Sequence, residues 1–364
     1  MDFFKLKKID WYIIKKFLGT YIFMIVLIIS IAVVFDINER IDRFIQIQED
    51  ALIKIIRDYY FNFIIFFTNL FSPLFVFLAV IFFTSKMANN SEVIAILSNG
   101  ISFKRLMKPY MIAAAAIAVT SFVFGSYIIP PANAIRTEFE LTYFSPHRRV
   151  TVDRDIQFRV GPNTIVYFGS FDLRNNTGHN FAMDHFDGLQ LVSRLTAHSI
   201  VYDTLFYWTI RDYQIRRFDG LIETIETGTS IDTVLNVVPS DFIVTRNDHI
   251  TMTSPQLRRH IANQRERGIG NIQPFQIEYH NRFALVFSAF ILTLIGASLS
   301  ARKVKGGMGM NIAFGVILSM GYILFMTISS SFAIRGGMNP MLAAWIPNII
   351  FACVAWVVST RAPS

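Results

Sequence analysis

Six long apolar stretches constrain this chain more than any other feature of its sequence. They carry few or no charges, and each is long enough to cross the hydrocarbon core of a bilayer, which takes about 20 apolar residues in a helix. They cover residues 17–35, 59–84, 111–129, 283–300, 310–334 and 341–359. Because 53% of the whole chain is hydrophobic, more than in most soluble domains, the stretches predict a membrane protein with six transmembrane helices.

The charged residues between these stretches predict which side of the membrane each loop faces. Thirteen Lys and Arg, but only three Asp and Glu, lie in the N-terminal segment, at residues 86–108, at residues 302–305 and at residue 361. An excess of basic residues marks the cytoplasmic side, so we expect both termini in the cytoplasm. The formal net charge of +8 is therefore a topology signal, and no nucleic-acid partner is expected.

Residues 134–274 have a different character. Apolar and polar residues alternate there, as in residues 164–169, 189–202, 206–218 and 222–234, and Gly-, Pro- and Asn-rich turns separate these segments. A period of two with such turns is typical of antiparallel β-structure. The sequence therefore predicts an inserted periplasmic all-β domain, a jellyroll or similar sandwich, followed by a polar helix or connector at residues 254–268.

Motifs of catalysis are missing from the sequence. It has no phosphate-binding P-loop and no His-Glu-x-x-His, and its seven histidines lack the spacing of metal ligands. Cys353, the single cysteine, excludes a disulfide within the chain and a thiol-based metal site. We therefore expect a binding or transport protein that has no cofactor and no enzymatic activity of its own and uses energy supplied by another component.

A short polar segment, residues 89–110, separates the second and third apolar stretches. Asn90 or Ser91 is expected to cap a helix there, Glu92 to lie in its first turn, where the helix dipole favours a carboxylate, and Gly100 to end it. The apolar positions of this helix are Val93, Ile94, Ile96 and Leu97. On charge alone, an ordinary basic cytoplasmic loop is favoured over a docking element for another protein.

The sequence Glu-Val-Ile-Ala-Ile-Leu-Ser-Asn-Gly-Ile-Ser at residues 92–102 resembles the coupling-helix motif of the LptF/LptG permease family (YjgP/YjgQ type). The N-terminal segment, Pro-Pro-Ala-Asn at residues 130–133 and residues 278–348 are similar to the same family. These permeases belong to the ABC transporter that extracts lipopolysaccharide from the bacterial inner membrane. The resemblance implies a periplasmic β-jellyroll and a helix that docks onto a separate ATPase, LptB, which binds the ATP. The docking residues would be Glu92, Ile96, Leu97 and Gly100.

The resemblance also implies three further partners: a second LptF/LptG-type permease, LptC and lipopolysaccharide itself. Candidate contacts for the lipid A phosphates are the arginines expected at the outer membrane face, Arg136, Arg40 and Arg43, because arginine binds phosphate through two hydrogen bonds. Arg136 is favoured, since the family carries functional basic residues after its third helix. The alternative is that these arginines pair with nearby acids such as Asp36, Glu138 or Glu140. Gly315 and Ser319 on the fifth helix would allow close approach at a seam with the second permease.

The chain is thus expected to divide into three parts. Residues 1–133 would form transmembrane helices one to three with the coupling helix near residues 89–100. Residues 134–274 would form the periplasmic β domain and connector, and residues 275–364 helices four to six. Chain length and the short β domain favour the LptG paralogue over LptF. A membrane-anchored sensor with a ligand-binding periplasmic β domain is the alternative function.

Overall fold

The computed structural model describes residues 7–45, 47, 51–144, 155–172, 174–204, 206–220, 222–242, 248–266, 272–301 and 307–361. The chain forms two compact units. The helical unit comprises Met1–Tyr143, His249–Ser254 and Gln273–Ser364, and the β unit comprises Phe144–Asp248 and Pro255–Ile272.

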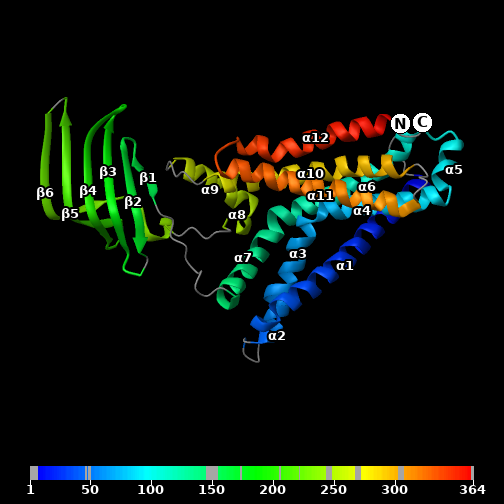
Figure 1. Ribbon diagram of the computed structural model, residues 1–364, viewed down its shortest axis with the longest axis horizontal. Coiled ribbons are helices and arrows are strands. Elements are labelled where there is room, and N and C mark those ends of the chain that lie inside the picture. Colours follow the sequence, from blue (N-terminus) through cyan, green and yellow to red (C-terminus); the bar gives the residue numbers. More distant parts are fainter. Residues whose placement is uncertain are drawn as a thin grey trace. The chain divides into compact units, whose positions relative to one another are not determined.

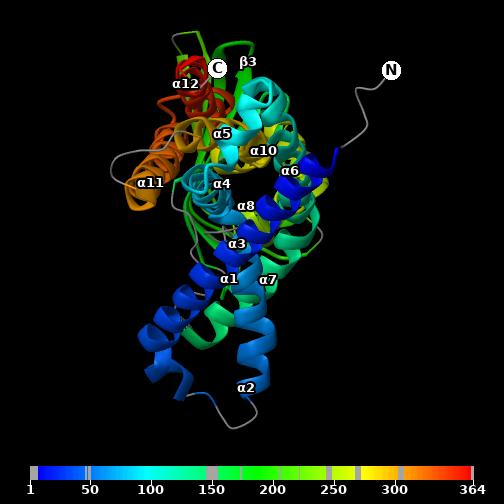
Figure 2. The same cartoon turned by 90° about the vertical axis from the view of Figure 1, so that its right-hand side faces the viewer.

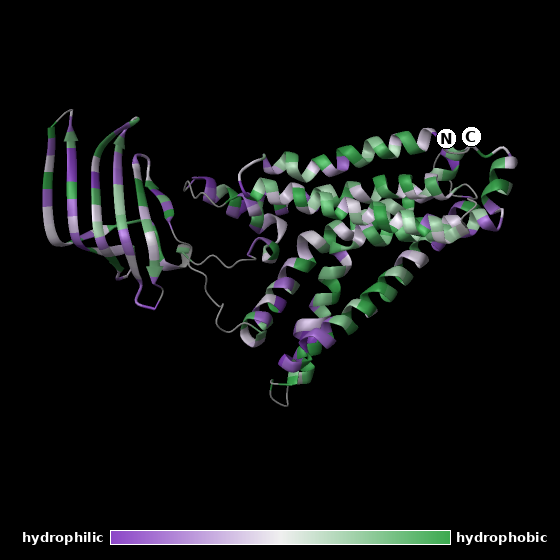
Figure 3. Cartoon of the chain, viewed as in Figure 1, coloured by the Kyte–Doolittle hydropathy of each residue, from purple (hydrophilic) through white to green (hydrophobic). Residues whose placement is uncertain are grey.

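Six helices in the described part of the chain are long and apolar enough to cross a membrane. They are Lys8–Ile45, Ser72–Asn89, Phe103–Phe144, Gln273–Ser300, Met308–Ile334 and Pro340–Thr360. Figure 3 shows apolar residues along most of their length. Their number and order confirm the prediction of six transmembrane helices.

The first helix, α1 (Lys8–Ile45), extends beyond the predicted apolar stretch at both ends. The buried acids Asp10 and Asp36 lie within it and not in flanking loops. No proline interrupts the segment, and both acids have partners inside the unit, so the helix continues past its apolar part. In Figures 1 and 2, the second half of α1 runs beside α3 and α7.

The next helical run is α2 (Ala51–Lys54), η1 (Ile55–Tyr60), α3 (Phe61–Leu70) and α4 (Ser72–Asn89), where η1 is a π-helix. Residues 51–57 lead directly into α3. The run breaks at Phe71, whose φ is −93° and ψ 8°. Pro73 explains the break, because its ring and missing N–H prevent a continuous helix.

The third apolar region starts after the short α5 (Glu92–Ser98). It comprises α6 (Phe103–Val123), the π-helix η2 (Phe124–Ile128), α7 (Ile129–Phe139) and the π-helix η3 (Glu140–Phe144). We expected it to end at Ile129, but the helical path continues through Pro130 and Pro131. Proline is tolerated in the first turn of a helical segment, and these two residues open α7 after the π-helix. This continuation carries Arg136.

The remaining membrane helices are α10 (Gln273–Ser300), α11 (Gly307–Ile334) and α12 (Pro340–Thr360). α10 is central, since it packs against α4, α6, α11 and α12. Beside it lies the short α8 (Asp248–Thr251). Asn133 donates to the carbonyl of Ile250 at 3.4 Å, and Arg282 donates to the carbonyl of Met252 at 2.9 Å and to the hydroxyl of Ser254 at 3.1 Å. These bonds anchor the returning chain in the helical unit.

The β unit contains six antiparallel strands in the order β1-β2-β3-β4-β5-β6. They are β1 (Ile156–Gly161), β2 (Thr164–Asp172), β3 (Thr177–Asp187), β4 (Gln190–Tyr202), β5 (Tyr207–Asp219) and β6 (Ile222–Val234). The inserted all-β domain is thereby confirmed. Each described strand pairs with its sequence neighbours. This arrangement is a meander, and among the described strands it lacks the crossed Greek-key connections of a two-sheet jelly roll.

One face of this sheet is covered by the chain that follows it. Leu235, Val237 and Phe242, the last on η5 (Pro239–Phe242), are almost fully buried against the strands. Phe242 stacks on Phe171 with ring centroids 4.1 Å apart, and the indole of Trp208 donates to the carbonyl of Val237 at 3.1 Å. The unit therefore has its own apolar core. The predicted polar helix is α9 (Ser254–Glu266).

Candidate functional site

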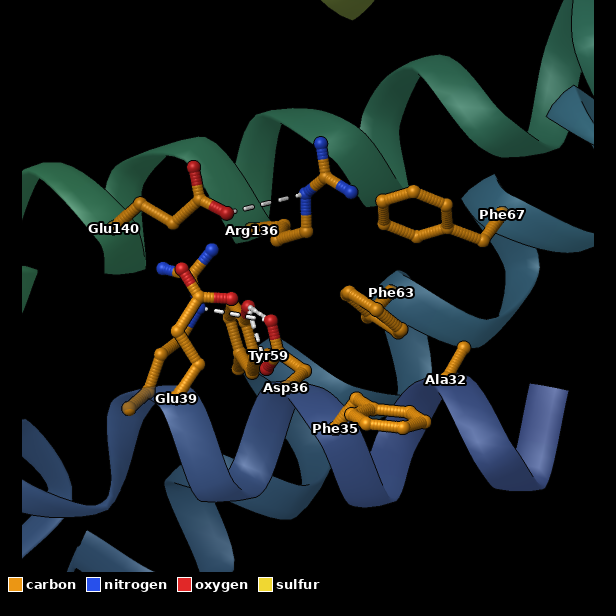
Figure 4. Close-up of a pocket in the computed structure, with 10 residues that line it drawn as sticks. Ala32, Phe35, Asp36, Glu39, Tyr59, Phe63, Phe67, Arg136 and Glu140 are labelled. Atoms are coloured by element: carbon orange, nitrogen blue, oxygen red, sulfur yellow. Dashed lines mark hydrogen bonds and ion pairs between the residues drawn. The ribbon is translucent and has the colours of Figure 1, made fainter.

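A pocket of about 410 Å³ lies among α1, η1, α3, α7 and η3 (Figure 4). Three carboxylates and two guanidinium groups line it together with aromatic rings. The lining residues are Ala32, Phe35, Asp36, Glu39, Arg40, Tyr59, Phe63, Phe67, Arg136 and Glu140. We call it the charged pocket. Ionisable side chains among apolar helices usually mark a functional site.

On one side of the charged pocket, Asp36 accepts hydrogen bonds from the neighbouring side chains. Its carboxylate accepts a hydrogen bond from Arg40 Nε at 2.8 Å and from the Tyr59 hydroxyl at 3.0 Å, and the Tyr60 hydroxyl adds a third at 3.3 Å. The Arg40 guanidinium also lies 5.5 Å from the centre of the Tyr59 ring. Asp36 is only 8% exposed, so these donors compensate a carboxylate that has lost most of its water.

Arg136 lies on the opposite wall and is satisfied less completely. The residue is 7% exposed, and its guanidinium lies 4.2 Å from the centre of the Phe66 ring. Glu140 Oε1 is 3.7 Å from Arg136 Nε, close enough for an ion pair. Among the described residues, however, Nε has no hydrogen-bond partner. A buried guanidinium with an unused donor beside a pocket suits an anionic ligand.

The structure brings together two of the three predicted cargo arginines. Arg40 and Arg136 both line the charged pocket, whereas Arg43 is exposed at the end of α1 and does not line it. The acidic pairing expected as the alternative is present: Arg40 pairs with Asp36 and Arg136 with Glu140. Tyr59 was missed as a site residue. In the sequence it was distinguished only as the first residue of the second apolar stretch.

α5, the helix predicted to dock onto the ATPase, has two of its predicted docking residues partly buried. Ile96 and Leu97 are partly buried and pack against the core of the helical unit, and Val93 is fully buried. Ile94, 56% exposed, is the large apolar side chain that points outward. Glu92 is in the first turn, and its carboxylate accepts from the Tyr12 hydroxyl at 2.9 Å.

The ends of α5 agree in part with the prediction. Gly100 adopts a φ of +78° and its N–H donates to the carbonyl of Leu97, so it ends the helix as expected. Ser91 precedes the helix with a φ of +62° and makes no side-chain cap bond. The predicted serine cap is therefore wrong. Asn90 Nδ2 instead lies 3.4 Å from Glu92 Oε1.

Gly315 and Ser319, which were predicted to form a seam with a second permease, face other parts of the same chain. A Cβ on Gly315 would lie 2.5 Å from Ile81 Cδ1, so the glycine permits close packing of α11 on α4. Ser319 is fully buried and donates to the carbonyl of Gly315 at 2.8 Å. The outward face of α11 carries Phe314, Ile317 and Leu324, all more than half exposed.

In the described part of the chain, no group of three His, Cys, Asp or Glu is placed to hold a metal ion. A family model described as the lipopolysaccharide export system permease LptF/LptG matches residues 11–361. The chain belongs to the LptF/LptG family. None of the curated proteins compared with the chain matches it.

Membership in the LptF/LptG family accounts for the architecture. The chain is a multi-pass inner-membrane permease of the lipopolysaccharide export transporter, with a β domain inserted between its membrane helices. The match also extends over the β unit.

Proposed function

We propose that this permease lifts lipopolysaccharide out of the inner membrane and that the charged pocket contacts a phosphate of lipid A. The observation that carries this proposal is Arg136, a buried guanidinium with an unused Nε donor on the wall of a 410 Å³ pocket. A phosphate oxygen accepts hydrogen bonds more strongly than a neutral group does, and arginine can offer it two parallel donors. The apolar rings of Phe63 and Phe67 beside it suit the adjoining acyl chains.

Extraction needs an external source of energy. Moving acyl chains from lipid into water costs about 0.8 kcal/mol for each CH₂. We propose that LptB supplies this energy by hydrolysing ATP and docks on the exposed face of α5, around Ile94. The positions of the basic loops favour a cytoplasmic location for that face and a periplasmic location for the β unit.

The remaining partners follow from the same proposal. A second LptF/LptG-type permease would complete the transport cavity, and the outward face of α11 offers it an apolar surface. Cargo would pass from the membrane to the β domains and on to LptC. Of the two paralogues, the chain is proposed to be LptG, for its length and short β domain. Family membership favours this transport role over a membrane-anchored sensor.

The test is site-specific photocross-linking to lipopolysaccharide. Phe35 lines the charged pocket and is 70% exposed, so a benzoylphenylalanine at this position keeps an aromatic ring there. Phe23 is the matched control, since it lies on the same helix, is 54% exposed and is outside the pocket lining. The assembled transporter in lipid nanodiscs would be irradiated with lipopolysaccharide, with and without ATP.

Cross-links from position 35 that exceed those from position 23 and fall during ATP turnover would support the proposal. Equal cross-linking at both positions would show that lipopolysaccharide meets α1 only as surrounding lipid, and would remove the charged pocket from the transport path.

A further inference from the structure

The N-terminal part of α1 contacts the first turn of α5 through Glu92. The Tyr12 hydroxyl donates to Glu92 Oε2 at 2.9 Å, and Lys16 Nζ lies 3.8 Å from Oε1. Lys16 also lies 4.5 Å from the centre of the Tyr12 ring, so the three side chains form one cluster. The hydrogen bond from Tyr12 and the ion pair with Lys16 together link the first turn of α5 to α1.

A second polar contact binds α1 just beyond the other end of α5. Arg105, in the first turn of α6, donates from both terminal nitrogens to the two oxygens of Asp10, at 2.8 and 2.7 Å. Asp10 is only 1% exposed and also accepts from the backbone N–H of Lys7 at 2.8 Å. Bidentate pairs of this kind fix orientation as well as distance. Ser102 stiffens the same turn by accepting from the Arg105 backbone N–H.

Apolar packing places both helices in one core. Val93 of α5 is fully buried in a core cluster that also contains Ile13, Ile14 and Phe17 of α1. Ile96 and Leu97 pack against the same cluster. Close-packed interiors transmit displacement because they deform little. The direct polar contact of α5 with α1 is thus at the first turn of α5, and Arg105 of the following helix adds a second contact to α1.

We propose that α1 and α5 move as one body, so that a displacement of α5 carries the charged pocket's Asp36 and Arg40 with it. Asp10, Tyr12, Lys16, Glu92 and Arg105, which we call the inner clasp, are the positioning residues. α1 is unbroken from Lys8 to Ile45, and Asp36 lies about 36 Å along the helix from Tyr12 at 1.5 Å per residue. The contacts of the inner clasp do not depend on the proposed function, but their use in transport rests on it.

Distance measurement tests the shared motion directly. Spin labels would be placed at Ser98 of α5 and Ile22 of α1, both exposed, in a Cys353→Ser background. Electron–electron double resonance would compare the nucleotide-free and vanadate-trapped transporter in nanodiscs. We expect one narrow distance distribution, unchanged between the two states. A shift in its mean between the states would overturn the proposal.

Substitutions test whether the inner clasp causes this coupling. Arg105→Gln removes the bidentate pair, Arg105→Lys keeps the charge, and Lys104→Gln is the matched control on the exposed neighbouring residue. We expect Arg105→Gln to broaden the distance distribution and to lower the lipopolysaccharide released per ATP by roughly tenfold, the effect of about one charge-assisted hydrogen bond. Arg105→Lys should recover part of both, and Lys104→Gln should change neither. Unchanged distances and release in Arg105→Gln would refute the role of the clasp.

A separate measurement distinguishes failure of the clasp from failure of the proposed function. A photoreactive residue at Ala95, exposed on α5, would report contact with the ATPase. If it does not cross-link to the ATPase, docking on α5 is wrong, while the label distances still decide whether α1 and α5 move together. If the residue at position 95 cross-links to the ATPase but the distances between the spin labels shift, docking of the ATPase on α5 is supported and the role of the inner clasp is refuted.

Discussion

Arg136 and Arg40 differ in how their charges are satisfied, although both line the charged pocket. Arg40 donates to Asp36 at 2.8 Å, and the same carboxylate accepts from two tyrosines. Arg136 has an aromatic ring against its guanidinium and Glu140 at 3.7 Å, without a hydrogen bond to Nε. An incoming phosphate would therefore displace fewer bonds at Arg136 than at Arg40. Arg136 is the more sensitive position for substitution.

We predict that Arg136→Glu lowers the apparent affinity for lipopolysaccharide by roughly 10- to 100-fold, since a charge-assisted contact worth about 1.5–3 kcal/mol becomes a repulsion. Arg136→Lys should lose less, because it keeps the charge and loses only the planar geometry. The measurement is lipopolysaccharide-stimulated ATPase activity of the assembled transporter, as a function of lipopolysaccharide concentration.

Arg43→Glu is the control for this series, because it reverses a charge on α1 outside the pocket lining. A purely structural Arg136 gives another pattern. Its reversal would lower the melting temperature of the complex, Glu140→Arg would restore it, and the lipopolysaccharide concentration dependence would stay normal.

At the scale of elements, α5 has one buried and one exposed face. Val93 is fully buried and Ile94 is 56% exposed, so substitutions at these neighbouring residues can separate an effect on folding from an effect on the proposed docking. We predict that Ile94→Asp reduces co-purification of LptB several-fold while leaving the melting temperature of the permease unchanged. Val93→Asp should lower the melting temperature itself, because it buries an unpaired carboxylate. Normal LptB yield with Ile94→Asp would exclude this face as the docking surface.

The contact between α4 and α11 depends on the absence of a side chain at Gly315. A Cβ there would lie 2.5 Å from Ile81, which is fully buried. We predict that Gly315→Leu destabilises the helical unit by about 1–3 kcal/mol, the usual cost of overpacking. Gly321→Leu, on the same helix with no atom within 4 Å of its Cβ position, should cost less. Thermal unfolding in detergent would compare the two variants, and equal melting temperatures would contradict the prediction.

At the scale of the whole molecule, the basic loops predict that the β unit lies outside the cytoplasm. Single cysteines at Asn176, Asp219 and Ser230, in a Cys353→Ser background, should react with an impermeant thiol reagent on intact spheroplasts. A cysteine at Ser98 of α5 should react only after lysis. The reverse pattern would show that the orientation is inverted, and with it the assignment of α5 to the ATPase.

The sequence determined the six membrane helices, their order and the inserted β-structure. The hydrocarbon core of a membrane requires long apolar helices, and a sheet with one covered face requires alternating apolar and polar residues. Both requirements therefore produce a local sequence pattern. The pattern is clear enough that the bounds of the strands predicted at residues 189–202 and 222–234 agree to within about one residue with those of β4 and β6.

Only the tertiary structure decided which polar residues meet. Asp36 and Tyr59 are 23 residues apart and Asp10 and Arg105 are 95 apart, and their contacts depend on how separate helices pack. The same holds for Gly315, whose small size permits the close packing of α11 on α4 of this chain. Composition reveals a small residue or a charge in a membrane helix, but the direction it faces is set by the neighbouring helices, which no local pattern records.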